Sequence, residues 1–192
     1  MNIFKLSFMY LLIFLCFDTT VFCQDLMVSF IDRTDTNNVK IELNQTLQLE
    51  GLKLKNVNSD MKVIIPHYIK NNIQYPYFSF LNLRFKSYII NSIKSNTING
   101  KPTGAVKYKI SRIRQNFNDS NIYASTFVTF NDLIEIECFI VKNKNRLSIL
   151  WPSIQTKDKT NILVFAIKDL ALKSQIENEI LNRYQIENRK TE

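Results

Sequence analysis

The sequence predicts an α+β fold of antiparallel sheets and helices, and three observations lead to this prediction. Short runs of alternating apolar and polar residues, typical of half-buried strands, follow one another in both halves of the 192-residue chain. Each half then ends in a stretch whose apolar residues recur at helical spacing. The two halves also repeat the same order of features at an offset of about 87 residues. We therefore expect two tandem units, each with a four-stranded antiparallel sheet and a C-terminal helix.

The strands of the second half follow from the alternation of apolar residues between turn residues. They are expected at 107–115, 122–130, 134–141 and 146–151. Pro152 ends the fourth strand, because proline has no N–H to donate to a sheet. A polar stretch at 153–161 and an apolar, buried-looking segment at 162–167 follow.

The helix of the second half is expected to begin after Asp169, whose carboxylate can accept hydrogen bonds from free N–H groups of a first turn. Its apolar stripe consists of Leu172, Ile176, Ile180 and Tyr184. In the first half, the corresponding stripe is Phe85, Ile89 and Ile93. The strand containing Val39, Ile41 and Leu43 has the cleanest alternation in the chain.

A change of apolar phase predicts a β-bulge in the third strand of each half. Leu49 is followed by Leu52, and Ile136 is followed by Phe139, so each alternation shifts by one position. A strand has a side-chain period of two residues and changes phase by gaining a residue. Bulges are therefore expected near Glu50-Gly51 and near Glu137-Cys138.

The repeat divides the chain into three parts. Residues 24–100 form the first copy and residues 101–192 the second. Gly100, Pro102 and Gly104 mark the join between them. Residues 1–23 precede both copies and have a different character.

The N-terminus is typical of a signal peptide. One positive charge, Lys5, precedes the apolar run Leu6–Phe17, which is too short to cross a membrane comfortably. Cleavage is expected between Cys23 and Gln24. Two alternatives remain open, a lipid anchor on Cys23 and an uncleaved anchor. All three place residues 25–192 outside the cytoplasm, in a periplasmic or secreted protein.

The residues that usually carry catalysis are scarce. Cys138 is the only cysteine beyond the N-terminal segment, and we interpret it as a small apolar residue. The single histidine, His67, is expected in a loop and has no partner pattern for a base. Glu135 and Glu137 share one face of a strand, which a solvated sheet explains. No Gly-rich phosphate loop or metal-ligand spacing occurs, so the sequence predicts a protein that is not an enzyme and needs no cofactor.

The net charge of +8 is shared between the copies. Residues 24–105 hold ten basic and six acidic residues, and residues 106–192 hold fourteen and ten. This balance is compatible with nucleic acid or an anionic surface as partner, and equally with an ordinary basic protein.

The candidate nucleic-acid-binding residues are Arg112, Arg114, Lys142, Lys144, Arg146, Lys157 and Lys159. Solvated loop charges are the competing interpretation, and it is favoured. Residues 75–78, Tyr-Pro-Tyr-Phe, could form a stacking surface, although packing between the copies is the favoured role.

Three motifs of the second copy carry a resemblance to a known family. They are Arg112-Ile113-Arg114 in the first strand, Val128-Thr129-Phe130-Asn131-Asp132 at the end of the second, and Trp151-Pro152-Ser153 after the fourth. With the helix ending at Tyr184, residues 107–185 resemble the septation protein SpoVG family (stage V sporulation protein G). Residues 24–100 resemble the same pattern more faintly, as a degenerate repeat.

This resemblance implies a fold and two functions. Family members form dimers, so two SpoVG-like copies in one chain would form a pseudo-dimer. They also bind DNA or RNA and are associated with cell division. Most of the family's basic residues after the Pro-Ser pair are absent here, at residues 154–166. The leading expectation is therefore an exported, non-enzymatic SpoVG-like binding protein, linked to the cell envelope or division septum and to an envelope protein partner. The alternative is a cytoplasmic DNA- or RNA-binding regulator; a hydrolase has no specific support.

The N-terminal interpretation leads to a first testable prediction. We expect the mature protein to lie outside the cytoplasm and to begin at Gln24, or at a lipidated Cys23. Cell fractionation followed by N-terminal sequencing and mass spectrometry distinguishes these products. Recovery of a cytoplasmic chain that begins at Met1 would contradict export.

Overall fold

Two five-stranded antiparallel sheets and two helices form most of the structure, a computed structural model that describes residues 26–58, 60–70, 72–98, 104–115, 121–143, 146–155 and 159–189. The predicted α+β class is confirmed, and every strand pairing between described residues is antiparallel. The expected signal peptide and most of the join between the copies lie outside these residues. Within the described part of the chain, no helix is long and apolar enough to cross a membrane.

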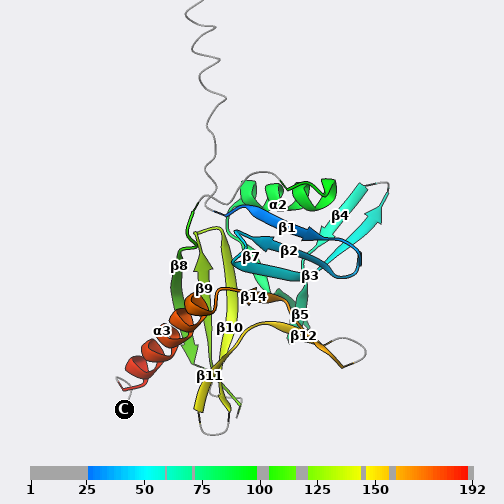
Figure 1. Cartoon of the computed structure of the whole chain (residues 1–192). Coiled ribbons are helices and arrows are strands. Elements are labelled where there is room, and N and C mark those ends of the chain that lie inside the picture. Colours follow the sequence, from blue (N-terminus) through cyan, green and yellow to red (C-terminus); the bar gives the residue numbers. More distant parts are fainter. Residues whose placement is uncertain are drawn as a thin grey trace, which may run out of the picture.

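The first sheet contains the strands of the first half and one strand from the second (Figure 1). Its order is β1 (Val28–Asp32), β2 (Val39–Leu43), β3 (Leu47–Val57) and β14 (Phe165–Ile167), and β4 (Asp60–Ile64) also pairs with β3. A tight turn joins β2 to β3, where Asn44 and Gln45 both have positive φ, as hairpin turns with right-handed twist require.

The second sheet has the same arrangement with the roles of the halves exchanged. Its order is β11 (Arg146–Leu150), β10 (Ile134–Asn143), β9 (Ile122–Phe130) and β8 (Tyr108–Gln115), and β7 (Phe78–Phe80) from the first half also pairs with β10. Asn131 and Asp132, between β9 and β10, again have positive φ. The strands expected from alternation in this half are therefore present, with ends that differ by at most two residues.

The prediction of four strands in each sheet is wrong, because each half gives one short strand to the sheet of the other half. Phe78 and Phe80 pair with Ile136 and Ile134 of β10. In the reciprocal exchange, Phe165 and Ile167 pair with Leu49 and Leu47 of β3, at positions 87 residues away in every case. The sequence analysis expected residues 162–167 to be buried but did not assign them to the opposite sheet, because alternation alone does not identify a pairing partner.

Two further hairpins precede the exchanged strands. The first is β5 (His67–Lys70) with β6 (Ile73–Pro76), and the second is β12 (Ser153–Gln155) with β13 (Asn161–Leu163). Both ends of the polar stretch at 153–161 thus pair as strands, which its composition alone did not predict. His67 is likewise an exposed strand residue rather than a loop residue.

One helix covers each sheet on its core side. Helix α2 (Leu83–Ser95) packs on the first sheet and α3 (Leu170–Arg189) on the second (Figure 1). Asn82 and Asp169 cap them, each accepting hydrogen bonds from two backbone N–H groups of the first turn. The expected apolar stripes are confirmed, with Leu172 only partly buried; the buried residues are Phe85, Ile89, Ile93, Ile176, Ile180 and Tyr184.

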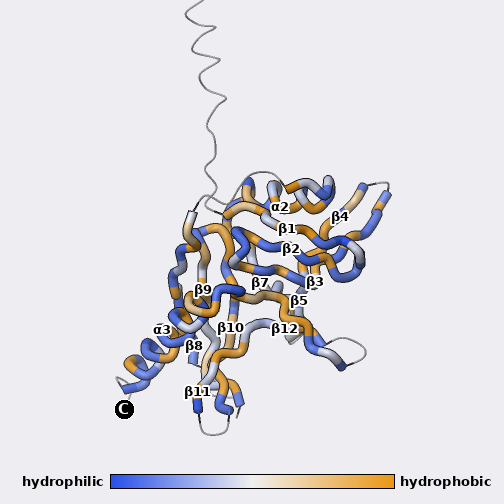
Figure 2. The backbone as a smooth tube through the Cα atoms, in the orientation of Figure 1, coloured by the Kyte–Doolittle hydropathy of each residue, from blue (hydrophilic) through white to orange (hydrophobic). Residues whose placement is uncertain are grey.

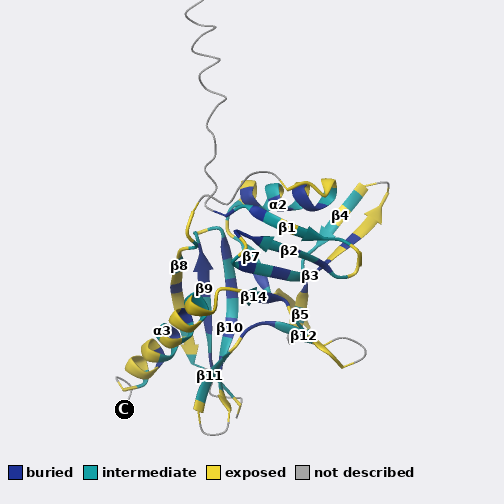
Figure 3. Cartoon of the chain, viewed as in Figure 1, coloured by how far each residue is buried: buried dark blue, intermediate teal, exposed yellow. Residues whose placement is uncertain are grey.

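A continuous core joins the two sheets (Figures 2 and 3). Phe165, in the first sheet, packs against two aromatic residues of the second half. Its ring centroid lies 5.2 Å from that of Phe130 and 5.4 Å from that of Trp151. Strand β14 therefore links the two sheets, because Phe165 pairs with Leu49 in the first sheet and its ring contacts Phe130 of the second.

Of the two bulges that the phase changes predicted, only the first is present. Between β2 and β3, Val39 pairs with Leu52 but Ile41 pairs with Leu49, so β3 contains one extra residue at the expected position. Gly51 adopts a φ of 80° there, which favours glycine.

The expected bulge near Glu137-Cys138 is wrong. Strand β10 pairs with β9 without interruption from Ile134 to Ile140, and the register shifts only after that pair, where β9 contains the extra residue. Cys138 and Ile140 face the core, so Phe139 lies on the opposite face. Phe139 is apolar although it faces away from the core, because that face of the sheet is also partly covered. Its position in the sequence therefore resembled a change of apolar phase.

A substitution in the exchanged strand tests whether the halves unfold together. Phe165→Ala is expected to lower the free energy of unfolding by about 3–5 kcal/mol, because it leaves a cavity where both halves meet. The variant should still show one transition, with coincident midpoints from circular dichroism and from the emission of Trp151, the only tryptophan. The control is Leu163→Ala in β13, where the side chain is 46% exposed and the change should cost below about 1 kcal/mol. Two separate transitions would contradict joint folding.

Candidate binding cleft

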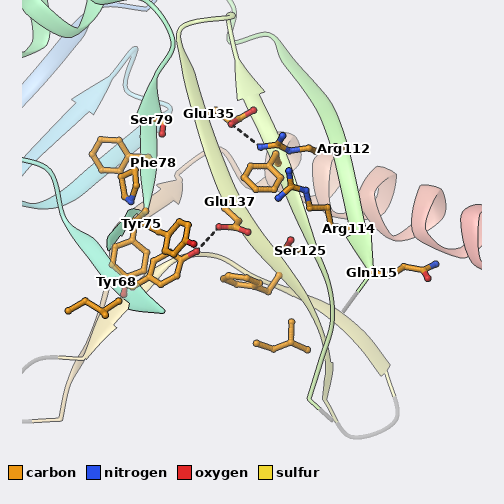
Figure 4. Close-up of a pocket in the computed structure, with 16 residues that line it drawn as sticks. Tyr68, Tyr75, Phe78, Ser79, Arg112, Arg114, Gln115, Ser125, Glu135 and Glu137 are labelled. Atoms are coloured by element: carbon orange, nitrogen blue, oxygen red, sulfur yellow. Dashed lines mark hydrogen bonds and ion pairs between the residues drawn. The ribbon is translucent and has the colours of Figure 1, made fainter. Parts of the chain in front are cut away.

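A cleft lies on the outer face of the second sheet, where the β5–β6 hairpin and β7 of the first half face it (Figure 4). Its volume is about 810 Å³, within the size range of small-molecule sites. The pairing of β7 with β10 holds the two walls together. The cleft is therefore assembled from both halves of the chain.

Tyrosines from the first half form one wall. Tyr68 of β5 stacks on Tyr75 of β6, with ring centroids 5.5 Å apart and planes inclined by 22°. Tyr77 contacts the same ring in a tilted arrangement at 5.3 Å. Across the cleft, the Tyr68 hydroxyl donates a 2.9 Å hydrogen bond to Glu137 of β10. Within residues 75–78, Phe78 pairs with Ile136 of the other half, while Tyr75 stays partly exposed and lines the cleft.

Arginines from β8 form the opposite wall. Arg112 and Arg114 lie two residues apart on one strand, so both side chains project to the same side. Their guanidinium carbons lie 3.9 Å and 5.4 Å from the centroid of the Phe127 ring, which places both within reach of a cation–π interaction. Arg112 also forms an ion pair with Glu135 at 3.8 Å. Within the described part of the chain, Arg114 has no carboxylate at ion-pair distance.

The regular alternation of β10 supplies the floor between these walls. Because Ile136, Cys138 and Ile140 face the core, the intervening residues Glu135, Glu137 and Phe139 face the cleft. Glu137 therefore lies between the tyrosine wall and the arginine wall in Figure 4. The missing bulge is what brings these three residues to one face.

A smaller hollow of about 240 Å³ adjoins the cleft. Tyr68, Tyr77 and Phe139 line both spaces, so these rings separate the two. The far side of the hollow is formed by Trp151 and Pro152, the pair that the sequence places at the end of the fourth strand. The Trp151 indole N–H donates a 2.7 Å hydrogen bond to Glu177 of α3, which orients the ring.

The corresponding place beside the first sheet is packed differently. Ile154 of β12 follows Pro152 at the same spacing as Tyr68 follows Pro66. Its terminal carbon would lie only 3.2 Å from a Cβ at Gly51. The glycine of the bulge therefore receives an aliphatic side chain where the second sheet has the Tyr68–Glu137 hydrogen bond.

Burial alters the proton affinities of two groups here. It raises the pKa of Tyr68, and the hydrogen bond and the charge of Glu137 raise it further. Burial also raises the pKa of the Cys138 thiol, which faces the core and stays protonated at neutral pH. The interpretation of Cys138 as a packed apolar residue agrees with this environment.

The structure separates the candidate basic residues into several places. Arg112 and Arg114 line the cleft. Lys142 and Arg146 are exposed near the tip of the β10–β11 hairpin, and Lys159 is exposed beside β13. Lys144 and Lys157 lie outside the described residues.

The sequence analysis missed the cleft residues that come from other strands. Tyr68 and Phe127 were not singled out, and Glu135 and Glu137 were interpreted as residues of a solvated face. The i, i+2 spacing of the glutamates was the available signal, but it did not show what covers them. Within the described ranges, no cluster of three or more His, Cys, Asp or Glu side chains could hold a metal ion.

Comparison of the chain with known protein families, with curated proteins and with solved structures finds no match.

The environment of Tyr68 predicts an alkaline effect on stability. The folded state holds this phenol proton more tightly than the unfolded chain does. The protonated Tyr68 should therefore contribute fully to the free energy of unfolding below about pH 10, and this contribution should be lost as the pH rises further. In Tyr68→Phe, the free energy of unfolding should therefore fall less steeply above pH 10 than in the parent. Denaturant titrations across this range measure the difference. Glu137→Gln, which removes the neighbouring charge, should have an intermediate effect; identical slopes in all three proteins would contradict this account.

Proposed function

We propose that this chain is a non-enzymatic binding protein of the SpoVG-like type, built from two tandem units, whose ligand occupies the cleft between the halves. The observation that carries the proposal is the cleft itself. It combines a stacked tyrosine wall, an arginine wall and a floor with two carboxylates, all at the junction of the two units. Such a combination of an apolar surface with a few convergent polar groups is typical of ligand sites.

The tandem pseudo-dimer is supported by the reciprocal strand exchange. Phe78 pairs with Ile136, and Phe165, 87 residues later, pairs with Leu49, 87 residues before Ile136. A backbone hydrogen bond of 2.9 Å from the Leu81 N–H to the Leu133 carbonyl follows the first exchange. Its counterpart, at the same offset, runs from Lys168 to Thr46 at 2.7 Å. Such reciprocity is what an approximate two-fold axis between two copies would produce.

A binding role without catalysis is supported by the state of the groups in the cleft. Glu135 is paired with Arg112, and Glu137 accepts a hydrogen bond from Tyr68. The raised pKa of Tyr68 makes its phenol a hydrogen-bond donor at neutral pH rather than a base. The cleft can therefore orient a ligand through groups that are already held in place.

The biological setting of the proposal follows from the N-terminal segment and the resemblance. Export would place the cleft outside the cytoplasm, and the SpoVG-like pattern suggests a link to the cell envelope or division septum. An envelope component, either a protein or a surface polymer, is then the partner that we propose.

Nucleic-acid binding is a second candidate function, and one observation favours it. Arg112 and Arg114 lie beside aromatic rings, as in grooves that bind single strands. Lys142 lies at the same end of the sheet, directly after the Val141–Ile122 pair. The two glutamates of the floor oppose this function, because they would repel phosphate groups.

A salt-titrated binding assay separates the two functions. For fluorescein-labelled dT10, we expect the parent protein to have a dissociation constant above about 100 µM at physiological salt. The nucleic-acid alternative predicts tighter binding that declines steeply with salt and is lost in Arg112→Ala/Arg114→Ala. Lys53→Ala/Lys55→Ala is the matched control, because it removes the same number of charges from exposed positions of β3 that do not line the cleft. Salt-dependent binding that only the first pair abolishes would overturn the leading function in favour of the second.

A further inference from the structure

The charges in the cleft are balanced. Two arginines and two glutamates are the charged side chains that line it among the described residues. Arg112 is compensated by Glu135, while Glu137 is hydrogen-bonded to an uncharged phenol. A polyanion would have to approach both carboxylates, and a polycation would have to approach both guanidinium groups. The balance therefore favours a ligand without net charge.

We propose that the cleft binds an uncharged, hydroxyl-rich ligand of the oligosaccharide class. The proposal rests on the binding function proposed above and identifies the ligand of that same site. It draws on three features of the cleft, which are the stacked tyrosines, the planar polar side chains and the adjoining hollow.

The stacked tyrosines offer a flat apolar surface to a sugar ring. The ring centroids of Tyr75 and Tyr68 lie 5.5 Å apart, and Tyr75 is 38% exposed. The pair therefore combines the Tyr68 ring, which is held in place, with the accessible ring of Tyr75. One face of a pyranose consists largely of C–H groups, whose partial positive charge is attracted to the negative face of an aromatic ring. A sugar can pack there without losing the hydration of its hydroxyl groups at the ring edge.

Planar polar side chains lie opposite this surface, where the hydroxyl groups would point. A carboxylate has about four acceptor sites and a guanidinium five donors. Tyr68 uses only one acceptor site of Glu137, and the Arg112–Glu135 pair at 3.8 Å leaves capacity on both partners. Adjacent sugar hydroxyls can each donate and accept, so they can bond to a carboxylate and a guanidinium at once.

These polar groups are held before any ligand arrives. Stacking on Phe127 and pairing with Glu135 orient Arg112, and the Tyr68 hydroxyl orients Glu137. Less conformational entropy is then lost on binding. A purely apolar ligand would lose this advantage, because it would remove the same groups from water without replacing their hydrogen bonds.

The size of the site favours a short oligomer over a single sugar. The cleft of about 810 Å³ continues into the hollow of about 240 Å³, where Trp151 and Phe139 extend the aromatic lining. A ligand that spans both spaces would pass over the Tyr68 and Tyr77 rings that separate them.

Isothermal titration calorimetry of the full chain tests the proposal with a panel of neutral tetrasaccharides. The panel contains α- and β-linked glucose, β-linked N-acetylglucosamine, β-linked mannose and β-linked galactose, and dT10 serves as the polyanion. We expect at least one tetrasaccharide to bind saturably and to change the emission of Trp151. Because the ligand is uncharged, its affinity should hold within about twofold between roughly 50 and 500 mM NaCl.

Variants of one hairpin locate the binding. Tyr75→Ala should weaken it roughly tenfold or more, since an aromatic contact is removed. Ile73→Ala is the matched control, because its side chain lies on the same strand, is 55% exposed and does not line the cleft. Glu137→Gln retains the shape of the floor and should weaken binding severalfold. Circular dichroism checks that each variant is folded. If a variant does not fold, Tyr68→Phe is tested in its place.

Each contrary outcome has a separate meaning. If no tetrasaccharide binds up to about 10 mM, or if Tyr75→Ala binds as well as Ile73→Ala, the oligosaccharide proposal is overturned. If dT10 alone binds and Arg112→Ala/Arg114→Ala abolishes it, the ligand class is wrong while the cleft remains the binding site. If chromatography shows that a bound tetrasaccharide is shortened, the ligand class stands and the non-enzymatic function fails.

Discussion

The reciprocal exchange of β7 and β14 is the constraint on which the rest of the structure depends. Each strand is three residues long and would bury few apolar groups alone. Paired with the long central strand of the other sheet, each places a phenylalanine, Phe78 or Phe165, in the core. Neither sheet is complete without the other half, so we expect the chain to fold as one cooperative unit.

The same exchange creates the cleft. Because β7 must reach β10, the hairpin before it is carried across the outer face of the second sheet. Tyr68 and Tyr75 then face side chains of β8, β9 and β10 that would otherwise be solvated. The hydrogen bond from Tyr68 to Glu137, over 69 residues of sequence, joins the tyrosine wall to the floor of the cleft. A connection required by the fold thus also forms one wall of the cleft.

The two connections that precede the exchanged strands differ in chemistry although their geometry is alike. Equivalent backbone hydrogen bonds run from Tyr77 to Pro66, at 3.1 Å, and from Val164 to Pro152, at 2.9 Å. Beside the first sheet, however, the glycine of a bulge packs against an isoleucine. Beside the second sheet, an uninterrupted strand presents two carboxylates to a tyrosine pair. This difference explains how the outer side of one sheet can form a polar cleft while the corresponding place beside the other sheet is closely packed.

Local periodicity determined the α+β class, the four long strands of the second half, both helical stripes and the Asp169 cap, because each of these depends on residues close together in the chain. It also identified Arg112 and Arg114, whose shared face follows from their spacing. Only the tertiary structure decided that β10 has no bulge near Cys138, because Phe139 is covered from outside by the first half. It alone also brought Tyr68 to Glu137, since a contact between distant segments leaves no periodic trace in either. Local sequence thus determined the helices and strands, whereas the cleft exists only where the two halves meet.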